Sequence, residues 1–184
     1  MTRYVALLRG INVGGHNRLP MATLRGVVES VGGTDVVTYV QSGNVVFTAP
    51  TGARTPAQAT RTPALAADIR AALAAETRLD IAFVLRTAGE WRAMIAGNPY
   101  PAAASEAKTL HITSFAAPPA VDTVDLNRFA PELFTLIGSD IYMHLPSGMG
   151  VSKLAIALER ATRARPGTTR NWTTVLAIEQ LLDR

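Results

Sequence analysis

The stretch "RGINVGGHNR", residues 9–18, gathers residue types that could bind an anion. It holds three glycines, two asparagines, two arginines and a histidine. Adjacent glycines such as Gly14-Gly15 let successive backbone N–H groups turn towards one anion, and Arg9 and Arg18 could add bidentate contacts. A tight turn explains the same residues, because glycine adopts positive φ and asparagine bonds its own backbone. The spacing leaves both interpretations open.

This loop matches no established phosphate-binding motif. A Walker A loop needs four residues between its glycines and then Gly-Lys-Ser/Thr, and the stretch contains no lysine. Its glycine spacing also differs from the G-x-G-x-x-G of dinucleotide-binding folds. An anion would therefore depend on the loop backbone and the arginines alone.

Two segments near the C-terminus also combine cationic and hydrogen-bonding side chains. In "MGVSKL", Ser152 and Lys153 stand at a predicted helix start, where the helix dipole favours anions. An ordinary N-cap serine followed by a solvated lysine is the alternative. In "TTRNW", Arg170, Asn171 and Trp172 unite a guanidinium, an amide and a ring that could stack a base. A capped helix with a core tryptophan is the alternative.

The sequence offers few groups for catalysis or metal binding. It contains no cysteine, which excludes disulfides, thiolate nucleophiles and cysteine zinc sites. Its three histidines are far apart and lack metal-ligand spacing, so we expect no metal and no other cofactor. No serine stands in a G-x-S-x-G elbow. His16, inside the polar loop, is the best proton-transfer candidate, since His111 and His144 lie in predicted strands.

Length and composition indicate a globular protein. A chain of 184 residues is typical of one domain or two small subdomains. The hydrophobic fraction of 48% and the charged fraction of 17% exclude a disordered chain. The apolar run near the N-terminus is too short for a signal peptide, and no segment approaches the ~18 apolar residues of a spanning helix. We therefore expect a soluble, cytoplasmic protein without a membrane partner.

The positive charge is concentrated in two segments. Residues 1–28 and residues 153–170 each carry a net charge of +4, whereas the rest of the chain carries −4. The two segments would form one electropositive face if the fold brings them together. Two separate solvated faces are the alternative.

Apolar periodicity predicts the order β-α-β-β-α-β for the first half of the chain. We expect strands at residues 4–8, 36–40, 45–48 and 81–86, and helices at residues 19–31 and 63–78. Gly43-Asn44 is predicted to supply the positive φ of a hairpin turn. Residues 49–63 are expected to form a mobile connection. A short helix should follow Thr87, which forms a capping box with Glu90.

The second half nearly repeats this order. We expect a strand at residues 109–115, a short helix at 121–129, a hairpin of 133–137 with 141–145, and a helix at 151–163. A final helix is expected from residue 168 onward, capped by Thr169 or Asn171. The prediction is an α+β fold of two ferredoxin-like subdomains. Residues 1–100 form the βαββαβ subdomain, and residues 105–184 form a βαββα unit with the C-terminal helix.

Four segments together resemble DUF1697, a bacterial protein family of unknown function. They are "ALLRGINVGGHNRLPMATLR", "TYVQSGNVVF", "SKL" and "TTRNWTTV". The resemblance covers almost the whole chain and implies the same two-subdomain fold, but no catalytic residue. His16 stands where relatives are expected to carry a lysine or another polar residue. The recurrent positions correspond here to Arg9, Gly10, Asn12, Gly14, Gly15, Met21, Ser42, Gly43, Asn44, Ser152, Lys153, Arg170, Asn171 and Trp172.

The first functional hypothesis is a binding protein for a small anionic ligand, phosphate-bearing or nucleotide-like. The polar motifs lie in three distant segments, which could converge in one cleft of a compact fold. The residues predicted to bind the ligand are Arg9, Gly10, Asn12, Gly14, Gly15, Ser42, Asn44, Ser152, Lys153, Arg170, Asn171 and Trp172.

Two other functions stay open from the sequence. Nucleic-acid binding is suggested by a ferredoxin-like sheet, which is the RRM scaffold, and by an isoelectric point of about 10.0. However, Phe47 stands alone on a strand where RRM domains need several stacking aromatic residues. The other alternative is an enzyme acting on a phosphorylated substrate, for which no nucleophile can be named. The sequence does not determine the oligomeric state.

Overall fold

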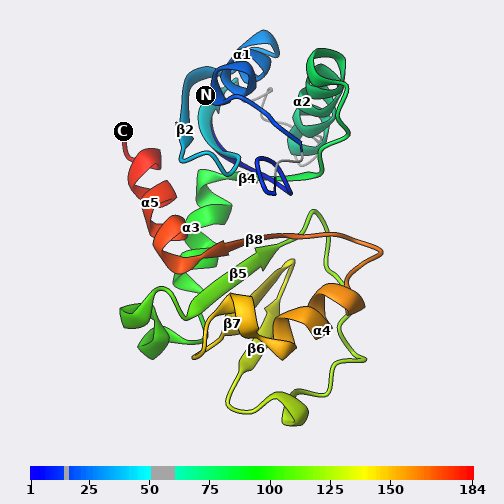
Figure 1. Ribbon diagram of the computed structural model, residues 1–184. Helices are drawn as coiled ribbons and strands as arrows, with labels where there is room; N and C mark the ends of the chain where they lie inside the picture. Colours follow the sequence, from blue (N-terminus) through cyan, green and yellow to red (C-terminus); the bar gives the residue numbers. More distant parts are fainter. Residues whose placement is uncertain (15–16, 51–60) are drawn as a thin grey trace. The chain divides into compact units, whose positions relative to one another are not determined.

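The computed structural model describes residues 1–14, 17–50 and 61–184. The chain divides into two compact units: the first is Met1–Arg92 with Ala177–Arg184, and the second is Ala93–Leu176. Each unit is built on a four-stranded antiparallel sheet (Figure 1). The expected mobile connection lies largely outside the described residues, as do Gly15 and His16.

The first unit has the ferredoxin-like strand order β2-β3-β1-β4. The central strand β1 pairs antiparallel with both β3 and β4. This confirms the βαββαβ order predicted for the first half. The elements are β1 (Thr2–Leu8), α1 (Met21–Ser30), β2 (Thr34–Tyr39), β3 (Asn44–Ala49), α2 (Arg61–Thr77), β4 (Phe83–Thr87) and the following helix α3 (Ala88–Ala96).

The core of the first unit lies between one face of this sheet and two helices. Alternate residues of β1 point into it, as the two-residue period of a strand requires. Helices α1 and α2 each add one apolar stripe with the predicted helical spacing. The core side chains from these three elements are Tyr4, Ala6 and Leu8, then Leu24, Val27 and Val28, then Leu65, Ile69 and Leu73.

The second unit has the equivalent strand order β6-β7-β5-β8. Its core covers one sheet face and includes apolar residues of α4. The elements are η2 (Pro101–Glu106), β5 (Leu110–Ser114), η3 (Leu126–Phe129), β6 (Leu133–Ile137), β7 (Asp140–His144), η4 (Met149–Val151), α4 (Lys153–Ala161), β8 (Thr168–Asn171) and α5 (Trp172–Leu182).

Two predictions for the second half were wrong. The helix expected at residues 121–129 is reduced to the 3-10 turn η3. The final helix begins at Trp172, because Thr168–Asn171 form strand β8 against β5. β-Branched threonines suit this edge, where the hydroxyls of Thr113 and Thr169 lie 2.8 Å apart. The second unit is therefore βαββαβ-like as well.

The pairing of β1 with β3 also has the same register as the pairing of β5 with β7. The Leu8 N–H donates to the Gly43 carbonyl at 2.8 Å, and the Phe115 N–H donates to the Ser139 carbonyl at 2.9 Å. These matching bonds place the end of the first strand of each unit beside its hairpin turn. The repeated element order predicted from the sequence therefore extends to individual hydrogen bonds.

The fourth strand of each unit ends in a residue that caps the following helix, directly after an arginine. Thr87 caps α3: its Oγ1 accepts the Glu90 N–H at 3.2 Å, and the Glu90 carboxylate accepts the Thr87 N–H at 2.7 Å. This confirms the predicted capping box. Asn171 caps α5, since its Oδ1 accepts the Thr174 N–H at 2.9 Å.

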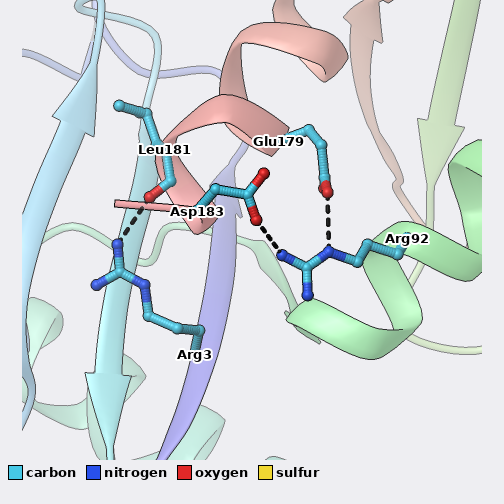
Figure 2. Close-up of polar contacts among 5 residues, drawn as sticks. All are labelled: Arg3, Arg92, Glu179, Leu181 and Asp183. Atoms are coloured by element: carbon cyan, nitrogen blue, oxygen red, sulfur yellow. Dashed lines mark hydrogen bonds and ion pairs between the residues drawn. The ribbon is translucent and has the colours of Figure 1, made fainter.

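Two arginines hold the end of α5 within the first unit (Figure 2). Arg92 on α3 contacts the carboxylates of Glu179 at 2.9 Å and Asp183 at 2.6 Å. Arg3 on β1 donates to the Leu181 carbonyl at 2.7 Å, in the last turn of α5. A cation at a helix C-terminus satisfies carbonyls that have no partner within the helix.

Among the described residues, no helix has the length and apolar content needed to cross a bilayer.

Substitution of two hairpin glycines measures the cost of positive φ apart from the cost of steric overlap. Gly43 and Gly138 both have positive φ, +75° and +59°. A Cβ on Gly43 would lie 2.6 Å from the Leu8 Cβ and 2.8 Å from the Ile11 Cδ1, whereas a Cβ on Gly138 meets nothing within 4 Å. We predict that Gly138→Ala lowers the free energy of unfolding by about 1–2 kcal/mol. Gly43→Ala should cost about 1–3 kcal/mol more. Urea unfolding followed by circular dichroism measures both, and equal losses would contradict the steric argument.

Candidate ligand-binding site

Asn12 braces the loop that follows β1. Its backbone adopts φ +55°, a region that asparagine tolerates. The side-chain amide donates to the Leu19 carbonyl at 3.0 Å and to the Gln41 carbonyl at 2.9 Å, and its Oδ1 accepts the Leu19 N–H at 2.9 Å. The amide of Asn12 therefore ties both the returning chain and the β2–β3 turn to the loop.

Asn17 closes the same loop from the other side. Its amide donates to the Gly10 carbonyl at 3.0 Å, and its own carbonyl accepts the Asn12 N–H at 3.2 Å. Gly10 and Gly14 have φ of +63° and +58°. The two asparagines thus make the backbone contacts expected of a tight turn. These contacts engage neither arginine side chain of the stretch.

The β2–β3 turn opposite this loop differs from the prediction. Positive φ occurs at Gly43 and at Val40 (+50°), but not at Asn44. Asn44 is the first residue of β3, fully buried, and its amide donates to the Tyr39 carbonyl at 3.1 Å and the Ser42 Oγ at 2.9 Å. A β-branched residue with positive φ is strained, and the bonds on either side of Val40 hold it there.

A hollow of about 470 Å³ lies between the loop and this turn. Such a volume is within the range of small-molecule sites, about 300–1,000 Å³. Arg18 and Gln41 are exposed there, and neither side chain has a hydrogen bond or ion pair with any described residue. The described lining consists of Asn12, Arg18, Leu19, Pro20 and Gln41.

Helix α1 starts at the rim of this hollow. Its N-cap is Pro20, which makes no side-chain capping bond, and its first turn contains no acidic residue. The N–H groups of that turn therefore have no side-chain acceptor from the cap. Their partial positive charge adds to that of the Arg18 guanidinium.

Only part of the predicted ligand set lines the hollow. Asn12 does, whereas Arg9, Gly10, Gly14, Ser42 and Asn44 lie outside the described lining. Arg18 was predicted as an anion contact but not as a member of the ligand set, and Gln41 was not predicted at all. The one signal for Gln41 was its position directly before the Ser42-Gly43-Asn44 motif.

In the second unit, Ser152 is the N-cap of α4. Its Oγ accepts the Ala155 N–H at 2.9 Å, and the Glu132 carboxylate accepts the Leu154 N–H at 3.0 Å. The start of α4 therefore already holds a carboxylate, while Lys153 is exposed. The N-cap interpretation of this segment is confirmed, and a second anion there would meet the charge of Glu132.

The Arg170-Asn171-Trp172 segment also has structural contacts. Arg170 is partly buried and donates to the Thr168 Oγ1 and the Thr169 carbonyl, both at 2.8 Å. Burial lowers the pKa of Arg170 to about 10. Asn171 caps α5, and Trp172 is only 3% exposed. A capped helix with a buried tryptophan is therefore present. The convergence of the three segments in one cleft stays a prediction.

Within the described residues, no three histidine, aspartate or glutamate side chains gather closely enough to hold a metal ion.

Strand order, register and the braced loop define the class: an α+β protein of two ferredoxin-like units. The chain belongs to the family described as "Protein of unknown function (DUF1697)", whose profile matches residues 1–142. A solved structure, that of "conserved bacterial protein SP0830 from Streptococcus pneumoniae", is similar with a TM-score of 0.69 and 24% identity over 98% of each chain. At this identity the likeness shows the fold alone. No curated protein matches the chain.

The strain at Val40 gives a stability prediction. Val40 is exposed, so Val40→Asn loses little apolar burial and places at φ +50° a residue that accepts it. We expect the free energy of unfolding to rise by about 0.5–1 kcal/mol. Val37→Asn, in the extended backbone of β2, is the matched control and should lower it by up to about 1 kcal/mol. Losses of similar size in both variants would contradict strain at Val40.

His111 on β5 gives a pH prediction. It is only 8% exposed, and burial lowers the pKa of its imidazole, while a hydrogen bond to the Thr109 backbone raises it. The unfolded chain therefore binds a proton at higher pH than the folded chain. The stability that comes from burying the neutral imidazole is therefore fully present above about pH 6.5, the pKa in the unfolded chain, and it is lost as the pH falls. His111→Gln should flatten the decrease in unfolding free energy between about pH 7.5 and pH 5. Urea unfolding across this range that shows the wild-type slope in the variant would contradict the role of His111.

Proposed function

We propose that this protein binds a small ligand through an anionic group, phosphate or one of similar charge, in the hollow of the first unit. The observation that carries the proposal is Arg18, which lines the hollow and whose guanidinium has no partner among the described residues. A guanidinium presents several donors in a planar fork that matches phosphate and carboxylate oxygens.

The charges around the hollow support an anion over a cation. Its described lining contains no acidic residue. The first turn of α1 contains none either, and residues 1–28 carry four arginines and no acid. An anion there would meet positive charge from the side chain, the helix end and the wider segment.

Hydrogen bonds also fix the described ends of the loop. Asn12 and Asn17 donate to carbonyls of Leu19, Gln41 and Gly10. Binding therefore does not have to order the backbone at these residues, and such ordering is one of the main costs of association. The smallest set that the proposal needs is Asn12, which holds the loop, and Arg18, which contacts the anionic group.

A ligand screen with one matched pair of variants tests this proposal. Phosphate, sugar phosphates and nucleotides are compared by thermal unfolding, where about 100-fold excess over the Kd stabilises by about 2.7 kcal/mol. We expect at least one compound to raise the Tm of the wild-type protein. Arg18→Ala should weaken its binding about tenfold or more, because a charge-assisted bond is lost. Arg184→Ala, which removes the same charge from the exposed chain end, should bind as the wild type does.

Two results would contradict the proposal. One is a wild-type Tm that no phosphorylated compound changes. The other is equal weakening by Arg18→Ala and Arg184→Ala, since it would show that only net charge matters. RNA retention that falls steeply with salt would favour the nucleic-acid alternative instead.

A further inference from the structure

We propose that Gln41 determines the specificity of this site by reading a planar, amide-like edge on the ligand, such as the hydrogen-bonding edge of a nucleobase. This inference rests on the proposed anion site, because it assigns the second exposed polar side chain of the same hollow. The ligand class is then a nucleoside monophosphate, or an anion with an equivalent ring, rather than inorganic phosphate.

The backbone of Gln41 is fixed on both sides. Its carbonyl accepts the Asn12 amide at 2.9 Å, across 29 residues of sequence. The Asn44 amide holds the residues around it through the Tyr39 carbonyl and the Ser42 Oγ. Val40 is kept at φ +50°, which a β-branched residue adopts only under constraint. Positive φ is common in hairpin turns, but here a β-branched residue bears it, directly before Gln41.

The side chain of Gln41 differs chemically from what a bare anion requires. An amide offers both donors and an acceptor, whereas the oxygens of a phosphate only need donors. Donor and acceptor together match the edges of nucleobases, as in bidentate contacts of glutamine with adenine. The amide therefore suits a part of the ligand other than its anionic group.

The remaining lining fits a ring between these two groups. Pro20 is exposed and offers a flat apolar surface, and Leu19 beside it is buried. Arg18 lines the same hollow. The lining of one hollow therefore offers a guanidinium for the anionic group, an apolar ring surface and an amide for a polar edge.

The test measures dissociation constants by titration calorimetry with five probes: ribose 5-phosphate and the 5′-monophosphates of adenosine, guanosine, cytidine and uridine. For the wild-type protein we expect one nucleotide to bind about tenfold or more tightly than ribose 5-phosphate and than the other three nucleotides. In Gln41→Ala that nucleotide should lose its advantage over the other three, while the Kd of ribose 5-phosphate should change by less than about twofold. Gln180→Ala, an exposed glutamine on α5, is the matched control and should keep the wild-type preference.

Each other outcome overturns the inference in a distinguishable way. If the wild-type protein binds ribose 5-phosphate as tightly as it binds every nucleotide, the site recognises the anionic group but not the base. If the preference for one nucleotide is unchanged in Gln41→Ala, another residue recognises the base. Failure of all five probes to bind the wild-type protein removes the proposed anion site itself, and this inference with it.

Discussion

The antiparallel pairing of β1 with β3 is the constraint on which the candidate site depends. Its register places Leu7 opposite Asn44, so the end of β1 meets the start of β3. The loop after β1 and the β2–β3 turn therefore come together, although they are about thirty residues apart in sequence. Because these two segments lie together, the Asn12 amide can donate to both the Leu19 and the Gln41 carbonyls beside the hollow. A one-residue slip of this register would reverse the faces of β1 and remove the core with the site.

The second unit repeats this strand pairing between β5 and β7, but with different side chains at the equivalent positions. Ser114 lies opposite Asp140 as Leu7 lies opposite Asn44, and the bond from the end of the first strand to the hairpin turn is the same. The position of the buried amide Asn44 is occupied by a buried carboxylate, Asp140. The fold thus supplies an equivalent scaffold twice, and the loops decide what each scaffold presents.

The polar side chains named around the loop and the β2–β3 turn fall into two groups. Asn12, Asn17 and Asn44 direct their amides to backbone carbonyls and so determine loop shape. Arg18 and Gln41 are exposed in the hollow that this shape creates. The asparagines make the tight-turn and ligand-loop interpretations compatible, because a rigid turn is what a preorganised site requires.

The sequence alone determined the apolar stripes of α1 and α2, the capping box of Thr87 and Glu90, and the α+β order of the first unit. These follow from local periodicity and from bonds between near neighbours. Tertiary structure decided that Thr168–Asn171 form a strand, since four residues acquire that state only beside the edge of β5. It also decided the shape of the turn around Val40 and the position of Gln41, because the Asn12 amide that holds them comes from a distant segment. Such contacts form only after the strands have paired, so no local pattern encodes them.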